Sequence, residues 1–258
     1  KAALLLGKMG AAAAAQKVES TMKSWKDNIW GVIKEVDTLT HAFERQMNFG
    51  PAYTQMITDQ YKELNEYGVS MEDVTQAHQA LARTVTDFTM LSGAQQRSMS
   101  DTIVLAGEYN IAFEDASTGV QSSMKFFGQS VQEADRTTLE LISTAQALGV
   151  EPQRLAQEFG AMGRSLAKMG DQGFKAFKGL AHIQKITGME MQKVLNLTNK
   201  FDTFEGAAEM AGQLNAALGG NFVNAMDMMM ETDPVARFEQ MRASLENAGL
   251  EFDSMSYY

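Results

Sequence analysis

Residues 199–237 read NKFDTFEGAAEMAGQLNAALGGNFVNAMDMMMETDPVAR, and they hold the densest set of helix start and stop signals in the 258-residue chain. Asp202 and Glu205 form an Asp-x-x-Glu pair, which is typical of a helix N-terminus. Gly219 and Gly220 indicate a helix end, because glycine adopts left-handed dihedral angles without strain. This stretch predicts short helices that follow one another through tight turns.

Apolar residues in and after this stretch recur at three- and four-residue steps, which indicates helices with one face buried in a core. Asp233 followed by Pro234 predicts the start of the last helix, with Asp as N-cap and Pro in the first turn. The stripe of the first helix is Phe204, Ala208, Ala211, Leu214 and Leu218. A short middle helix runs through Val223, Met226 and Met230. The stripe of the last helix is Val235, Phe238, Met241, Leu245 and Ala248.

The composition extends this reading to the whole chain and predicts an all-α protein. The apolar fraction is 45%, enough for a core, and only three prolines occur against 21 glycines, so glycines carry most of the helix punctuation. Residues 101–106 (DTIVLA) are the best strand candidate, and a buried helical turn explains them equally well. Cysteine is absent, which excludes disulfides and cysteine-ligated metals.

A recurring corner, Gly-apolar-(Ser/Glu)-x-x-x-apolar, begins at Gly68, Gly149, Gly188 and Gly249, and a looser copy begins at Asn110. The pattern predicts a left-handed residue that ends one helix, followed by acidic or hydroxyl groups at the start of the next. Successive corners are 42, 39, 39 and 61 residues apart. The spacing suggests a two-helix repeat of about 40 residues, and the alternative is ordinary corner chemistry in a non-repetitive helical protein.

The N-terminal segment, residues 1–49, is predicted to be one long amphipathic helix. Its apolar positions follow strict four–three steps, so it is either a coiled-coil oligomerisation segment or a helix on a globular core. These positions are Val18, Met22, Trp25, Ile29, Val32, Val36, Leu39 and Phe43. Gly50-Pro51 predicts the boundary to a compact multi-helix region, residues 50–258.

Methionine is unusually frequent, with 19 residues, and a cluster follows Gly219-Gly220. Flexible thioethers make adaptable binding surfaces, and the alternative is a loosely specified core. The candidate interaction surface is Met226, Met228, Met229 and Met230. A second Gly- and Met-rich segment, residues 156–180, is read as small-residue helix packing, with a conformational hinge as the alternative.

No motif for catalysis, cofactor binding or metal binding is found in the sequence. His41, His78 and His182 have no ligand-spaced neighbours, so each is expected to be solvated. No nucleotide-binding loop or nucleophile elbow occurs, and we expect no enzyme activity, no cofactor and no metal. Residues 2–15 are too short an apolar run to span a membrane. The net charge is −10 and most negative in residues 199–258, so direct nucleic-acid binding is not expected.

Residues 201–220 and 230–258 together resemble a segment of the tail tape measure proteins of long-tailed bacteriophages. The resemblance implies a very long, mostly helical structural protein present in several copies inside the tail tube. Such a protein sets tail length during viral tail assembly and leaves ahead of the genome at infection. Some members carry peptidoglycan-cleaving domains, but no residue of this chain is assigned to that role.

These observations predict a fragment of a longer virion protein, made in the host cytoplasm and placed in the tail or at its tip. Expected partners are further copies of the chain, through the heptad positions, and tail-tube and tail-tip or baseplate proteins. Membrane contact is expected only through sequence outside residues 1–258. The alternative function is a cellular helical adaptor or scaffold that binds amphipathic helices.

Overall fold

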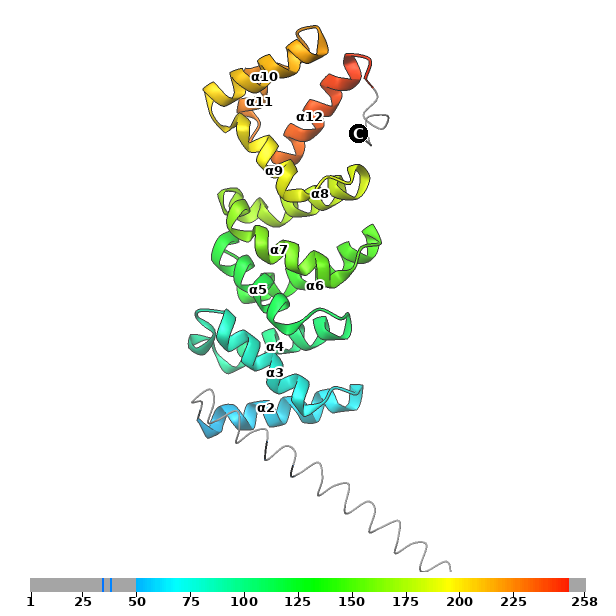
Figure 1. Ribbon diagram of the computed structural model, residues 1–258. Helices are drawn as coiled ribbons and strands as arrows, with labels where there is room; N and C mark the ends of the chain where they lie inside the picture. Colours follow the sequence, from blue (N-terminus) through cyan, green and yellow to red (C-terminus); the bar gives the residue numbers. More distant parts are fainter. Residues whose placement is uncertain (1–33, 35–37, 39–49, 251–258) are drawn as a thin grey trace, which may run out of the picture. The chain divides into compact units, whose positions relative to one another are not determined.

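The computed structural model describes residues 34, 38 and 50–250, and the regular elements in this part of the chain are all helical (Figure 1). The all-α prediction is confirmed. Residues 101–106 belong to α4 (Gly93–Glu108), so the helical reading of that segment is the correct one. Lys34 and Thr38 are helical, but the heptad positions from Val18 to Phe43 lie outside the described residues, and the coiled coil stays a prediction.

Contacts divide the chain into two compact units, and the first comprises Lys1–Gln79 with Ser92–Arg97. Its described part contains α2 (Pro51–Leu64), the 3-10 turn η1 (Asn65–Tyr67), most of α3 (Met71–Thr84) and the start of α4. Gly50 is the N-cap of α2 and Pro51 occupies its first turn, where the missing N–H of proline is not needed. Ile57, Val74 and Ala77 are fully buried between these helices.

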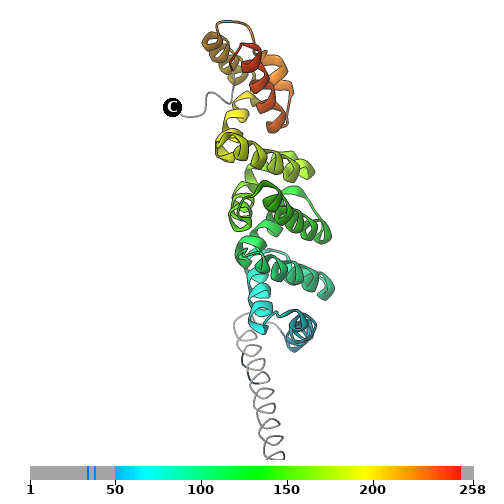
Figure 2. The same ribbon diagram turned by 90° about the vertical axis from the view of Figure 1, so that its right-hand side faces the viewer.

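The second unit comprises Ala80–Leu91 and Ser98–Tyr258, described to residue 250. After the remainders of α3 and α4 its elements are η2 (Phe88–Met90), α5 (Phe113–Phe127), α6 (Val131–Leu148), α7 (Pro152–Leu166), η3 (Ala167–Gln172), α8 (Gly173–Thr187), α9 (Met191–Asn199), η4 (Lys200–Asp202), α10 (Phe204–Leu218), α11 (Ala225–Met230) and α12 (Pro234–Asn247). Helix α5 packs along α6 and α7, and α7 packs against α8 (Figure 2).

Aromatic rings fill the core between α5, α7 and α8. Phe159 lies at the centre, with ring centroids 5.0 Å from Phe177, 5.4 Å from Phe174 and 5.8 Å from Phe127. Glycines in the segment 156–180 let these helices approach closely. A Cβ on Gly163 would lie 2.6 Å from the Ser122 hydroxyl oxygen, so only glycine fits there. This is the small-residue packing that the sequence indicated.

The predicted corners are confirmed, because every one of them has a left-handed residue at its first position. The φ angles are +90° at Gly68, +58° at Asn110, +61° at Gly149, +71° at Gly188 and +81° at Gly249. At three corners the backbone amide of the residue after the left-handed one donates to the carbonyl five residues earlier, which closes the helix end. These hydrogen bonds run from Ile111 to Ala106, from Val150 to Ala145 and from Leu250 to Leu245, at 3.0–3.1 Å. The sequence pattern missed one further corner, at Gly128, where Ser130 and Glu133 form a capping box.

Three details of the opening stretch were predicted wrongly. Helix α11 begins at Ala225, so Val223 precedes the middle helix instead of lying in it. The N-cap of α10 is Thr203, whose hydroxyl accepts from the Gly206 amide at 3.1 Å, and Asp202 serves a different purpose. Phe204 is 68% exposed and Ala208 is exposed, so the buried stripe of α10 is rotated towards Ala207 and Ala211. The predicted turn at Gly219 and the Asp233 N-cap are both present.

Candidate functional site

Residues 189–250, called here the C-terminal lobe, are held together by one buried arginine. Arg237 lies in the first turns of α12 and is only 2% exposed. Its Nε donates to the Met228 carbonyl at 2.9 Å, and its Nη1 donates to the Thr198 carbonyl at 2.9 Å and to Asp202 Oδ1 at 2.5 Å. One side chain thereby joins α12 to the ends of α9 and α11 and to η4.

Asp202 completes this cluster from the solvent side. Its Oδ2 accepts from Lys168 Nζ at 2.6 Å, and the same ammonium group donates to Asn199 Oδ1 at 2.6 Å. Partial burial raises the pKa of Asp202, but the hydrogen bonds from Lys168 and Arg237 outweigh it and hold the pKa below its usual value. Asp202 is therefore ionised at neutral pH and is the counter-ion of Arg237.

A cavity of about 480 Å³ adjoins this cluster, with Lys168, Lys175, Asp202, Asp233 and Arg237 among its lining residues. Lys168 and Arg237 both pair with the Asp202 carboxylate, and Asp233 Oδ1 accepts from the Val235 amide at 2.9 Å as N-cap of α12. The charged groups around this cavity therefore stabilise the lobe.

A second hollow in the lobe, called here the apolar groove, has a different character. Its volume is about 180 Å³, and its lining is almost entirely apolar. The lining residues are Met189, Leu197, Leu214, Leu218, Val223, Phe238, Met241, Arg242 and Leu245. Arg242, the one charged residue among them, pairs with Glu246 at 3.0 Å and with Glu239 at 3.7 Å.

Asn215 shapes one wall of the apolar groove by holding the loop after α10. Its Oδ1 accepts from the amides of Phe222 and Val223 at 2.8 and 2.7 Å, and its Nδ2 donates to the Val223 carbonyl at 2.8 Å. These bonds place Val223, which is 4% exposed, against the groove. The sequence pattern did not identify Asn215, because its partners lie in an irregular loop.

The methionine cluster is split between the interior and the surface. Met228 is 2% exposed, whereas Met226 is 47% and Met230 is 74% exposed, and Met229 is partly buried. Helix α11 turns Met228 inwards, so the exposed part of the candidate interaction surface is Met226 and Met230. The candidate oligomerisation residues Val18, Met22, Trp25, Ile29, Val32, Val36, Leu39 and Phe43 lie outside the described residues.

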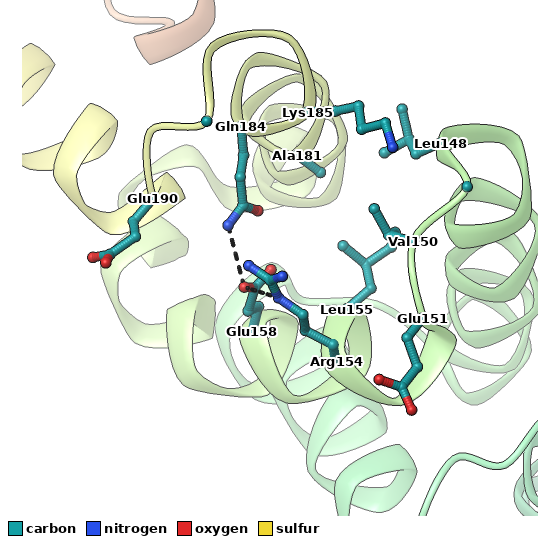
Figure 3. Close-up of a pocket in the computed structure, with 12 residues that line it drawn as sticks. Leu148, Val150, Glu151, Arg154, Leu155, Glu158, Ala181, Gln184, Lys185 and Glu190 are labelled. Carbon is teal, nitrogen blue, oxygen red and sulfur yellow. Dashed lines mark hydrogen bonds and ion pairs between the residues drawn. The ribbon is translucent and has the colours of Figure 1, made fainter. Parts of the chain in front are cut away.

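Two of the recurring corners border the same cavity between α6, α7 and α8 (Figure 3). The cavity holds about 650 Å³, and Glu151 and Glu190 of the two corners line it together with Lys185. Arg154 donates to the Glu158 carboxylate at 3.1 Å, and the Gln184 amide donates to that carboxylate as well. The lining combines the Arg154–Glu158 ion pair with the charged side chains of Lys185, Glu151 and Glu190, so it offers polar contacts to a ligand or partner.

His78 contradicts the expectation of a solvated side chain, because it is fully buried in the first unit. Its Nδ1 lies 2.7 Å from the Tyr53 hydroxyl and its Nε2 lies 2.7 Å from Gln60 Oε1. A neutral ring satisfies both partners, as acceptor at Nδ1 and donor at Nε2. Burial lowers the pKa of His78 to about 3. Of the other histidines, His182 is exposed as expected and His41 lies outside the described residues.

Within the described ranges, no group of three or more His, Asp or Glu side chains is placed to hold a metal ion. The same part of the chain contains no helix that is both long and apolar enough to cross a membrane. Comparison with protein families, curated proteins and solved structures finds no match to this chain.

Proposed function

We propose that the chain is part of the tape measure protein of a long-tailed bacteriophage, a non-enzymatic structural component of the tail. In this role several copies lie in the tail tube or at its tip, set tail length during assembly and leave ahead of the genome at infection. Copies associate through the heptad positions between Val18 and Phe43, and the helical lobes contact tail-tube and tail-tip proteins.

The observation that carries the proposal is the sequence of residues 201–220 and 230–258, whose pattern resembles that family. The fold is compatible with it. The described part of these residues forms α10, α12 and the corner at Gly249, and Arg237 fastens them to the rest of the lobe. The lobe is folded and helical, and its apolar groove is suited to contact with other tail proteins.

The location of the chain in assembled particles tests this proposal. Antibodies raised against the chain are used to label intact tailed particles from the encoding strain, and quantitative mass spectrometry measures its copy number per particle. We expect several copies in the tail of intact particles and a loss of the chain after ejection is triggered. A chain that is absent from purified particles would contradict the proposal.

A helical adaptor that binds amphipathic helices is the second candidate, because the apolar groove has the lining that such a partner requires. A gene far from tail genes, together with the chain's absence from particles, would favour the adaptor.

A further inference from the structure

We propose that the apolar groove is a docking site for an amphipathic helix with a basic polar face, supplied by a partner protein. This proposal concerns the groove alone, and it stands whichever assembly contains the chain.

The size and lining of the groove fit an apolar side chain of a partner. An apolar cavity of about 150 Å³ stays dry and admits a ligand of the size of benzene. The groove, at about 180 Å³ with an almost wholly apolar lining, has room for one leucine or aromatic side chain. A polar side chain or a strongly hydrated ion would lose its hydrogen bonds there, which excludes them as occupants.

The two helices that form the walls of the groove each present apolar side chains one helical turn apart. Leu214 and Leu218 are one turn apart on α10, and Met241 and Leu245 are one turn apart on α12. Three of these four side chains are only partly buried, so they keep apolar surface for a partner. A bound helix can insert one apolar side chain between these two rows, and its apolar side chains at i+3 or i+4 and i+7 can then lie along the partly exposed wall residues.

Charge selects the kind of helix. The C-terminal lobe carries nine acidic and four basic side chains between residues 189 and 250. Three of the four cations are paired with carboxylates of the lobe: Lys193 with Glu190, Arg237 with Asp202, and Arg242 with Glu246. The lobe that contains the groove therefore has a net charge of −5, from four basic and nine acidic side chains, which attracts a helix bearing Lys or Arg and repels one bearing Asp or Glu.

Exposed apolar side chains are concentrated in the same lobe. Of the eleven large apolar side chains that are exposed in the described chain, five belong to it: Phe204, Phe222, Met226, Met230 and Leu250. Methionine adapts its shape to different partners, so Met226 and Met230 offer further apolar surface in the lobe to a partner.

Binding of two matched peptides to the whole 258-residue chain tests the proposal. Each peptide has about 18 residues, or about five helical turns, with leucines at i, i+4, i+7 and i+11. One carries lysines on its polar face and the other carries glutamates at the same positions. We expect the lysine peptide to bind at least about tenfold more tightly at low salt, with the ratio narrowing at about 0.5 M salt as the charges are screened.

Two groove variants and one control locate the binding site. Leu214→Trp fills the groove and Leu218→Asp places a carboxylate in it, and each is expected to weaken binding of the lysine peptide at least about tenfold. Leu139→Asp changes a side chain of α6 that is 42% exposed and outside the lobe, and it should leave binding unchanged. Circular dichroism verifies that each variant is folded. If Leu218→Asp unfolds, the binding measurement with Leu214→Trp decides the test.

Four results would overturn the proposal. Equal binding of both peptides removes the charge argument, and unchanged binding by folded groove variants removes the site. A dimer of the chain that Leu218→Asp abolishes identifies a second copy as the occupant. A tenfold gain in affinity on removing residues 251–258 identifies that segment as the occupant.

Discussion

At the scale of single residues, two buried polar side chains join elements that are separate in the sequence. Arg237 and His78 are 2% and 0% exposed, and both are surrounded by hydrogen-bonding partners. Buried polar groups stabilise a fold only while all partners remain, because each partner that is left alone keeps its desolvation cost.

Replacing Arg237 with Met tests its role as the fastener of the C-terminal lobe. The substitution removes the guanidinium that donates to the Thr198 and Met228 carbonyls and pairs with Asp202, so we expect a loss of about 2–4 kcal/mol in the free energy of unfolding. Arg242→Met is the matched control, because its salt bridges are at the surface, and it should cost less than about 1 kcal/mol. Urea denaturation measures both, and equal losses would show that Arg237 is no more than a surface charge.

Because His78 is buried in its neutral form, we expect the stability of the fold to fall in mild acid. Its pKa is about 3 in the folded chain and near 6.5 when unfolded, so between these values the unfolded state binds one more proton. The contribution of the neutral His78 ring to the free energy of unfolding is complete above pH 6.5. It is lost as the pH falls, and the free energy of unfolding is lower by about 1.4 kcal/mol at pH 5.5. Urea denaturation at pH 7.5 and 5.5 measures this loss. His78→Gln should flatten the dependence, whereas His182→Gln, at an exposed site, should keep it.

At the scale of elements, α10 contains two glycines whose environments are opposite. Gly206 lies in the first turn, where an added Cβ would collide with the backbone carbonyl of Lys200. Gly212 lies mid-helix, and nothing is within 4 Å of an added Cβ. A backbone atom cannot move aside as a flexible side chain does, so the two positions respond differently to the same methyl group.

Gly206→Ala should therefore lower the free energy of unfolding by about 1–3 kcal/mol, through overpacking against the backbone. Gly212→Ala should raise it by about 0.5–1 kcal/mol, since alanine has the higher helix propensity and meets no obstacle. Thermal or urea denaturation of the two single variants checks the pair. If both variants changed the free energy of unfolding in the same direction, the close approach of Gly206 to the Lys200 carbonyl would be contradicted.

At the scale of the whole molecule, the central prediction is self-association through the heptad positions. We expect the chain to sediment as an oligomer at micromolar concentration and above, because an apolar a/d stripe of this length is stable only when it is covered. A double variant, Ile29→Lys with Val36→Lys, should sediment as a monomer. Leu139→Lys, at an exposed site on α6, is the control and should stay associated. A wild-type chain that is monomeric at high concentration would exclude the coiled coil.

The local signals of the sequence determined where helices begin and end. Glycine and Asn110 mark the corners because few other residues adopt positive φ, and Asp233-Pro234 marks a helix start because it satisfies free amides. These are short-range effects, so they can be read from neighbouring residues. The proposed role in a phage tail also rests on the sequence alone.

Only the tertiary structure decided what the side chains between those signals contact. Asp202 reads as a helix cap, but Lys168 and Arg237, both more than thirty residues away, make it a counter-ion. His78 reads as a solvated residue, but Tyr53 and Gln60 enclose it. The apolar groove combines residues from three helices and two loops. Such sites depend on long-range packing, which periodicity and local propensity do not encode.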